Sequence, residues 1–339
     1  MTVVNIMRRT FSVLLLLAVT TTGTATAAGP DPKYKAPRTE NGQPDLQGVW
    51  NFSSGVPLQR PTAFADRKTL TKEEFEKQRA AMLNGIAGIT KFAPVEAVAV
   101  DWIDNTLHVD DLRTSLIAYP ENGRLPALVE GVQRMPTVDE ILSLLADAKG
   151  GSLPPGLLAL FAMFGNVKRD SYENFTPSER CLSSAIVPLA PGLGDNYVQI
   201  IQAKDHVALL MDDSRRLVTI EAKPRAGEKL RNWDGASRGH WEGETLVIES
   251  ANFNSRTPSF AGAGNSHDKV VTERLTRTSK GVIEYTATVV DPKTFQDKVE
   301  IAFPMAHVDA HIYESACHEG NYSMRNTLSA VRKDEEAKR

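Results

Sequence analysis

Residues 269–291 read KVVTERLTRTSKGVIEYTATVVD, and this stretch decides the fold. Two runs of alternating side chains, Lys269–Arg277 and Val282–Asp291, are separated by the short turn Ser279-Lys280-Gly281. A period of two on both sides of a tight turn predicts an antiparallel hairpin with one buried face. The buried face of the second run is predicted to carry Ile283, Tyr285, Ala287 and Val289, and the exposed face Glu284, Thr286 and Thr288.

The same period continues through the C-terminal half of the chain. Short antiparallel strands with tight turns predict a mainly β protein, an up-and-down barrel with a helical N-terminal insert. Gly48-Val49-Trp50 in an early strand resembles the opening of lipocalin-like barrels. A two-sheet β-sandwich is the alternative. The further candidate strands are Tyr197–Ala203, His206–Asp212, Leu217–Glu221, Arg238–Trp241, Thr245–Glu249, Lys298–Phe303 and His311–Cys317.

Glu273 is the one carboxylate on an otherwise apolar strand face. It shares that face with Val271 and Leu275, so the alternation places it inside the barrel. A buried carboxylate is unfavourable unless it is paired or its pKa is raised. A raised pKa is therefore one expectation, and the other is pairing with one of three arginines, namely Arg238, Arg256 or Arg274.

Residues 1–27 have the pattern of a secretory signal peptide. Arg8 and Arg9 precede the apolar run Phe11–Val19, and Ala25-Thr26-Ala27 supplies small residues for cleavage. The protein is therefore expected in the periplasm or secreted, through the Sec or the twin-arginine route. The apolar run is too short to span a bilayer, and no later stretch reaches about 18 apolar residues, so no membrane span is expected.

The rest of the chain divides by composition. Thr71–Leu83 is predicted to be a helix, because Thr71 and Glu74 match a capping box. A second helix is predicted at 136–149, and the apolar residues 157–164 either pack on the barrel or act as a lid. The predicted parts are an arm with the first strand (28–68), a helical and loop insert packed on the barrel (69–185), the barrel with the site (186–332) and a charged tail (333–339).

The two cysteines, Cys181 and Cys317, would meet an oxidising compartment after export. A disulfide between them is the first interpretation, and a nucleophilic thiol at Cys317 beside His318 is the alternative. The net charge is −3 and the charges are interspersed, which excludes the basic stripe typical of nucleic-acid-binding proteins.

The polar loop before Lys269 carries the candidate chemistry. His267 is predicted to be a general acid or base that Asp268 or Glu273 orients. Asn254 and Arg256 are predicted to hold a carboxylate or an oxyanion. The alternatives are that His267 caps a strand and that Asn254 and Arg256 brace the loop. Ser266-His267-Asp268 is not a triad by adjacency, since neighbours on an extended chain point to opposite faces.

His318 and Glu319 follow Cys317 and are predicted to lie at the rim of the barrel. His318 would assist His267, and Glu319 would join Asn254 and Arg256 in binding the substrate. Trp233 and His240 complete the predicted substrate-binding set. No cofactor is predicted, because no known metal-ligand spacing is present. The alternative is a divalent metal held by His267, Asp268, His318 and Glu319.

Five segments resemble motifs of a family of exported bacterial β-rich proteins. The chain departs from the family at His240, where the family usually has arginine, and in the apolar residues 137–164. The resemblance implies a secreted β-rich domain and carries no established activity. The segments are Pro-Asp-Leu-x-Gly-Val-Trp at 44–50, Arg-Thr-Ser-Leu-Ile with its following Pro and Gly-Arg at 113–124, Glu-Arg-Cys-Leu at 179–182, the run from Gly-x-Trp-Glu-Gly-x-Thr-Leu-Val to Glu-Arg at 239–274, and Tyr-Glu-x-Ala-Cys-His-Glu-Gly-Asn-Tyr at 313–322.

Two functions follow from these observations. The first is an exported, cofactor-free acid–base enzyme (a hydrolase, lyase or isomerase) that acts on a small, partly apolar organic molecule. The alternative is an exported barrel that binds an apolar small molecule. No nucleotide-binding or nucleophile-elbow motif occurs in the chain.

Overall fold

The structure is a computed structural model, which describes residues 34–64, 67–81, 109–134, 170–175, 177, 179–182, 187–192, 196–220 and 230–338. The predicted signal peptide (1–27) and the helices predicted at 136–149 and 157–164 lie outside these residues. No helix of the described ranges is both long and apolar enough to cross a membrane.

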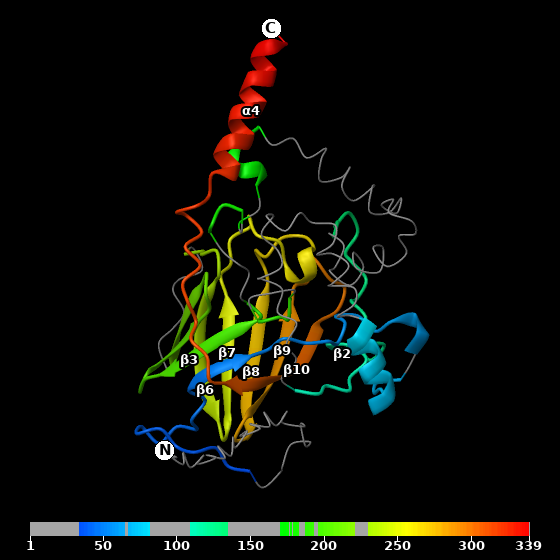
Figure 1. Ribbon diagram of the computed structural model, residues 1–339, viewed down its shortest axis with the longest axis vertical. Helices are drawn as coiled ribbons and strands as arrows, with labels where there is room; N and C mark the ends of the chain where they lie inside the picture. The colour runs from blue at the N-terminus through cyan, green and yellow to red at the C-terminus, as the bar shows by residue number, and fades with distance from the viewer. Residues whose placement is uncertain are drawn as a thin grey trace, which may run out of the picture.

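Nine strands close into a β-barrel, which confirms the predicted fold class (Figure 1). Around the ring the order is β1, then β3 to β10 in sequence, and β1 closes the ring by pairing with both β3 and β10. A tenth strand, β2 (Ile117–Tyr119), pairs with the beginning of β10. The ring strands are β1 (Gly48–Asn51), β3 (Tyr197–Gln202), β4 (His206–Leu210), β5 (Arg215–Ile220), β6 (Ala236–Glu242), β7 (Thr245–Ala251), β8 (Val270–Ser279), β9 (Val282–Val290) and β10 (Val299–Val308).

The ring departs from the predicted meander in two places. β5 and β6 are parallel, with Thr219 opposite Arg238, whereas antiparallel neighbours were predicted throughout. The connection between them is long enough for the chain to return to the same end of the barrel, as a parallel pair requires. The strand predicted at His311–Cys317 is wrong: these residues form no strand. The closing position belongs to β1, which buries Val49 and Trp50 between β3 and β10.

Apolar side chains from alternate strand positions fill the barrel, as the alternation predicted. Trp50 is fully buried, and its indole Nε1 donates to the Leu46 carbonyl at 2.8 Å. The rings of Tyr285 and Phe303 lie 4.7 Å apart between centroids. The predicted inward positions are all buried, namely Val271, Leu275, Ile283, Tyr285, Ala287, Val289, Val299, Ile301 and Phe303.

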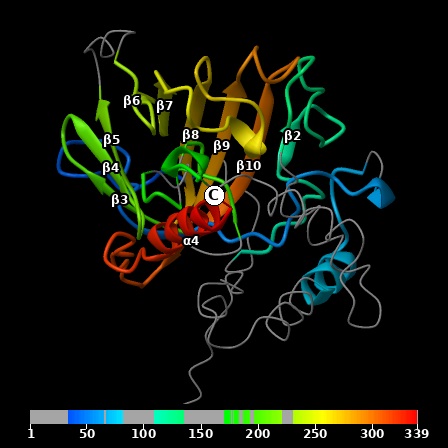
Figure 2. The same cartoon turned by 90° about the horizontal axis from the view of Figure 1, so that it is seen from above.

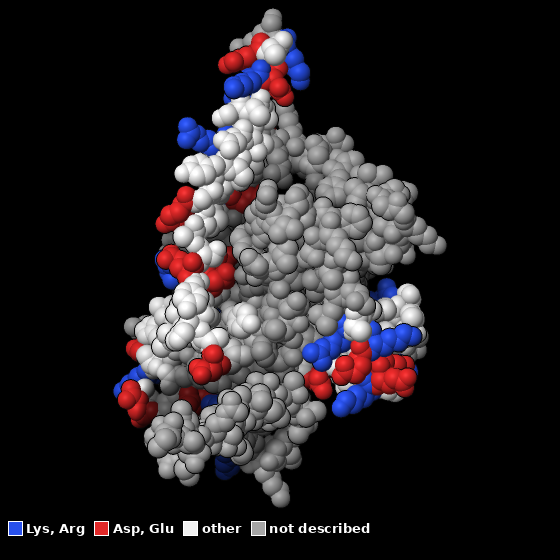
Figure 3. All heavy atoms as spheres, in the orientation of Figure 1, with Lys and Arg blue, Asp and Glu red and all other residues white. Residues whose placement is uncertain are grey.

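Outside the ring, residues 72–81 form a helix. The predicted capping box is present: the Thr71 backbone N–H donates to the Glu74 carboxylate at 2.8 Å, and the Glu74 N–H donates to the Thr71 hydroxyl at 3.2 Å. On the face shown in Figure 3, lysines and arginines alternate with acidic side chains around this helix. Three short 3-10 helices are Thr62–Phe64, Tyr172–Asn174 and Phe260–Gly262.

The C-terminal segment returns to the loop end of the barrel, which we define as the end where β7 stops at Ala251 and β8 starts at Val270. This is the upper end in Figure 1. The disulfide Cys181–Cys317 is present, with Cα atoms 5.8 Å apart, which confirms the first interpretation of the two cysteines. Beyond it, α4 (Ser323–Ala337) projects from the loop end (Figures 1 and 2). The predicted tail, 333–339, begins inside this helix.

Candidate functional site

The loop between β7 and β8, residues 252–269, covers part of the loop end. Phe253 anchors its first half, since the ring is buried and Asn232, before β6, bonds to the flanking backbone. Ser266 anchors the second half, because its buried hydroxyl donates to the Asn254 carbonyl at 2.9 Å and also contacts the Thr257 hydroxyl. Ser266 therefore has a structural role in the loop.

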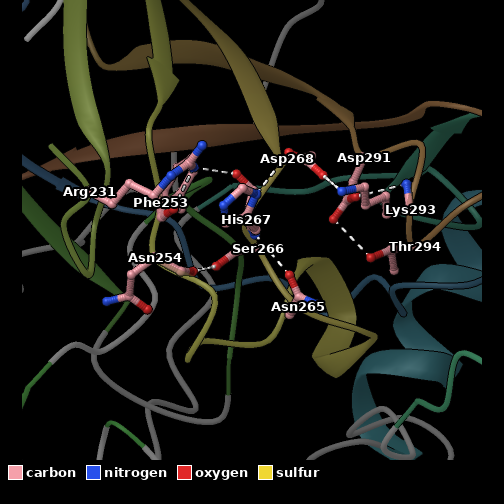
Figure 4. A network of polar contacts seen from close by, with 10 residues as sticks. All are labelled: Arg231, Phe253, Asn254, Asn265, Ser266, His267, Asp268, Asp291, Lys293 and Thr294. Carbon is pink, nitrogen blue, oxygen red and sulfur yellow. Dashed lines mark hydrogen bonds and ion pairs between the residues drawn. The ribbon is translucent and has the colours of Figure 1, made fainter. Parts of the chain in front are cut away.

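His267 and Asp268 face one another in a tight turn (Figure 4). His267 Nδ1 lies 2.9 Å from Asp268 Oδ1, and Lys293, between β9 and β10, places Nζ 2.6 Å from Asp268 Oδ2. The Lys269 N–H donates to the Ser266 carbonyl at 3.2 Å and closes the turn. Neighbouring side chains meet here because the backbone turns, whereas on a strand they would point apart.

The electrostatics of the pair favour an ionised Asp268. Hydrogen bonding to Lys293 lowers the pKa of Asp268, and hydrogen bonding to His267 lowers it further. An ionised Asp268 accepts the Nδ1–H of His267, which leaves Nε2 as the basic nitrogen. The His267 side chain is 39% exposed, so its ring is accessible to a molecule that binds at the loop end. Of the two predicted orienting groups, Asp268 is the one that contacts His267.

Arg231 fixes the backbone under His267, and the sequence alone did not indicate this role. One guanidinium nitrogen donates to the His267 carbonyl at 2.7 Å and to the Phe253 carbonyl at 3.0 Å (Figure 4). The two carbonyls belong to opposite ends of the loop, so Arg231 ties these ends together. The only sequence signal was an arginine shortly before the β6 strand.

Glu273 lies inside the barrel, as predicted, but none of the arginines named as its partners is correct. Arg216 of β5 donates to both carboxylate oxygens, at 2.6 and 2.9 Å, and the Tyr285 hydroxyl donates at 2.7 Å. The pair spans the interior, because β6 and β7 separate β5 from β8 in the ring. The arginines expected to pair with it lie outside and have other acidic partners: Arg238 contacts Glu249, Arg256 contacts Glu173 and Arg274 contacts Glu242.

Burial changes the acidity of this interior cluster. Removal from water raises the pKa of Tyr285 well above its usual value, and the neighbouring Glu273 charge adds to the effect. Tyr285 thus stays a hydroxyl donor to Glu273 while its oxygen accepts the Leu189 N–H at 3.0 Å. Both carboxylate oxygens of Glu273 accept hydrogen bonds from Arg216 or Tyr285, so the position of Glu273 supports a structural role.

Lys269 is another buried cation, and the sequence alone did not predict its burial. Its Nζ donates to the Val187 carbonyl at 3.2 Å and lies 4.2 Å from the centre of the Phe253 ring. Burial lowers the pKa of Lys269 to about 8, against the opposing charges of Asp291, Asp234 and Glu273. Lys269 directly precedes β8, the strand that carries Glu273, so two buried ionisable groups lie close together in the sequence here.

The Lys269 ammonium should make stability depend on pH. Because the folded pKa is about 8 and the unfolded value is 10.5, the unfolded chain binds more protons between these values, and stability rises with pH there. We compare the free energies of unfolding of the wild type and of Lys269→Met. The wild-type value minus the variant value should increase by on the order of 3 kcal/mol between the folded and the unfolded pKa. Urea unfolding from pH 7 to pH 10.5 measures it, and a difference that stays constant with pH would contradict the burial argument.

A second group of predicted residues meets at segment 170–182. Arg256 lies 3.5 Å from the Glu173 carboxylate, and its backbone N–H donates to the Asn254 side chain at 2.8 Å. The Trp233 ring lies under the guanidinium of Arg180, 5.6 Å from the ring centre. Asn254, Arg256 and Trp233 therefore all border the loop end.

The remaining predicted residues lie elsewhere. His240 is exposed on β6 and contacts Glu242 at 3.0 Å, near the opposite end of the barrel. His318 and Glu319 are exposed in the turn after the disulfide. Within the described ranges, histidine, cysteine and acidic side chains form no group of three suited to a metal, and this holds for His267, Asp268, His318 and Glu319, the ligands of the alternative metal site.

Comparison with known proteins gives no relative from which a function can be transferred. No protein-family model matches the chain, and the searches of curated proteins and of solved structures give no match either. The geometry of the loop end therefore carries the functional interpretation.

Proposed function

We propose that this protein is an exported acid–base enzyme, a hydrolase, lyase or isomerase, in which His267 transfers the proton. The observation that carries the proposal is the 2.9 Å contact between His267 Nδ1 and Asp268 Oδ1, with Lys293 2.6 Å from the other carboxylate oxygen. A histidine oriented through one nitrogen presents the other to a substrate, which is the arrangement that general bases use. The disulfide suits an exported protein.

In the proposed step, His267 Nε2 accepts a proton from a bound water or from the substrate. The imidazolium that forms is stabilised by the ionised Asp268, whose pKa is lowered by Lys293 and by His267. Arg231 keeps the histidine in place by binding its carbonyl oxygen. His267 returns the proton to the leaving group or to the product, so that no external reagent is needed.

The rim is favoured over the barrel interior as the substrate site. The ion pair between Arg216 and Glu273 crosses the interior, and Tyr285 and Phe303 stack beside it. These side chains occupy the volume where a ligand of a binding barrel would lie. An apolar-ligand carrier is thus the weaker interpretation.

The test compares two histidine–aspartate pairs of the same chain. His206 Nδ1 lies 2.8 Å from Asp205 Oδ1 and the His206 side chain is 39% exposed, like His267, but this pair lies at the far end of the barrel. Turnover is measured on a panel of p-nitrophenyl esters and by deuterium exchange at the α-carbons of small ketones. His267→Ala is expected to lower kcat/KM about 10²–10⁴-fold, whereas His206→Ala should leave it unchanged.

Asp268→Asn separates orientation from a general loss of structure. It should lower kcat/KM by at least about 10-fold while circular dichroism and the unfolding midpoint stay close to those of the wild type. Activity that survives His267→Ala, or that falls equally in His206→Ala, contradicts the proposal. So does a lack of His267-dependent turnover on both panels.

A further inference from the structure

The guanidinium of Arg180 lies close to two aromatic rings at the loop end. Its guanidinium carbon lies 5.1 Å from the centre of the Tyr172 ring and 5.6 Å from the centre of the Trp233 ring. The two rings come from segments 170–182 and 230–235, which the chain separates by more than forty residues. Cation–π contact on two rings restricts the guanidinium plane before any ligand arrives.

In the part of the chain that the structure describes, Arg180 makes no ion pair and donates no hydrogen bond, whereas the nearby Arg231 donates to two carbonyls. Stacking occupies the faces of a guanidinium and leaves its N–H groups free at the edges. A fixed fork of free donors is what recognises the two oxygens of a carboxylate or a phosphate.

A second guanidinium lies beside this stack. Arg256 is exposed and is 3.5 Å from the carboxylate of Glu173, the residue that follows Tyr172. Arg180 thus contacts Tyr172 and Arg256 contacts Glu173, so the two guanidiniums meet neighbouring residues of one segment. Arg256 is already paired with Glu173, whereas Arg180 has no ion pair among the described residues, so Arg180 is the cation that suits a negatively charged ligand.

We propose that Arg180 and Arg256 form an oxyanion subsite, in which the stacked Arg180 is the main anchor for a carboxylate or phosphate group. The inference rests on the proposed function, because the anion would belong to the substrate on which His267 acts. Trp233 connects the two parts, since Arg231, two residues before it, binds the His267 carbonyl (Figure 4). The proposed substrate class is a small, partly apolar organic anion.

The test measures binding directly and needs no turnover. Benzoate, its neutral counterpart benzamide, and inorganic phosphate are titrated into ¹⁵N-labelled protein, and the indole N–H signal of Trp233, assigned with Trp233→Phe, reports binding. Benzoate or phosphate should shift this signal saturably, and benzamide should not. The anion that binds more tightly identifies the recognised group.

Variants locate the subsite. Arg180→Met should weaken anion binding about 10-fold or more, and Arg180→Lys should restore only part of it, because an ammonium lacks the planar fork. Arg256→Met should weaken binding less. Arg238→Met is the matched control, since Arg238 lies on the outer face of β6 and pairs with Glu249. This variant should bind the anion with the affinity of the wild type.

The inference is overturned if benzamide binds as well as benzoate, if neither anion binds, or if Arg180→Met keeps wild-type affinity. The anion should bind His267→Ala as tightly as the wild type, because His267 is not part of the subsite. Anion binding without His267-dependent turnover would contradict the proposed reaction and leave the subsite intact. Turnover without anion binding would contradict only the subsite.

Discussion

Replacing Glu273 with leucine is expected to lower the free energy of unfolding by about 3–5 kcal/mol, because it leaves the buried charge of Arg216 without its carboxylate partner. Arg216 is almost fully buried, and Glu273 accepts two of its hydrogen bonds. The Tyr285 hydroxyl loses its acceptor in the same variant. Equilibrium unfolding in guanidinium chloride at pH 7, with the disulfide intact, measures the loss.

Two further variants show whether the charge or the packing is responsible. Tyr285→Phe removes one hydroxyl from the same cluster and should cost about 1–2 kcal/mol. The double variant Arg216→Met/Glu273→Leu removes both charges and should recover most of the loss, since an apolar pair of similar size needs no compensation. If the double variant is as unstable as Glu273→Leu alone, the unpaired charge of Arg216 is not the cause of the stability loss.

Removing the disulfide with Cys181→Ser and Cys317→Ser is expected to lower the free energy of unfolding by about 2–5 kcal/mol. The bond joins residues 136 positions apart and holds the end of the chain on the loop end. Among the described residues the other contacts there are few. The Ser315 N–H donates to the Asp212 carbonyl, the Asn321 side chain donates to the Glu179 carbonyl, and the Arg332 side chain donates to the Asp170 carbonyl. α4 has no buried residue of its own.

The effect should begin locally. Without the bond, residues 309–338 are expected to open before the barrel does, because exposed helices with few tertiary contacts have low local stability. Limited proteolysis followed by mass spectrometry should show early cleavage in this range in the serine variant and in the wild type treated with a dithiol. An unchanged cleavage pattern together with a stability loss under about 1 kcal/mol would contradict this expectation.

The site was only partly predictable from the sequence, and His267 shows why. Its type and its place in a polar loop indicated acid–base chemistry, but the sequence left Asp268 and Glu273 open as its partners. Adjacent side chains meet only if the backbone turns between them, and the closing hydrogen bond from Lys269 to Ser266 makes that turn. The position of Arg180 was not predictable from the sequence, because its two aromatic neighbours come from distant segments that meet at the loop end.

By itself, the sequence determined the strands of the hairpin at 269–291, their buried face and the inward direction of Glu273, because alternation and tight turns are local properties. It also indicated a barrel and the disulfide. Only the tertiary structure decided which strand closes the ring and that Arg216 neutralises Glu273. Arg216 shares its face with Val218 and Ile220, so its inward direction was implicit in the sequence of β5. The contact between Arg216 and Glu273 was not implicit in the sequence. Their strands, β5 and β8, are separated by β6 and β7, and the side chains meet only across a closed barrel.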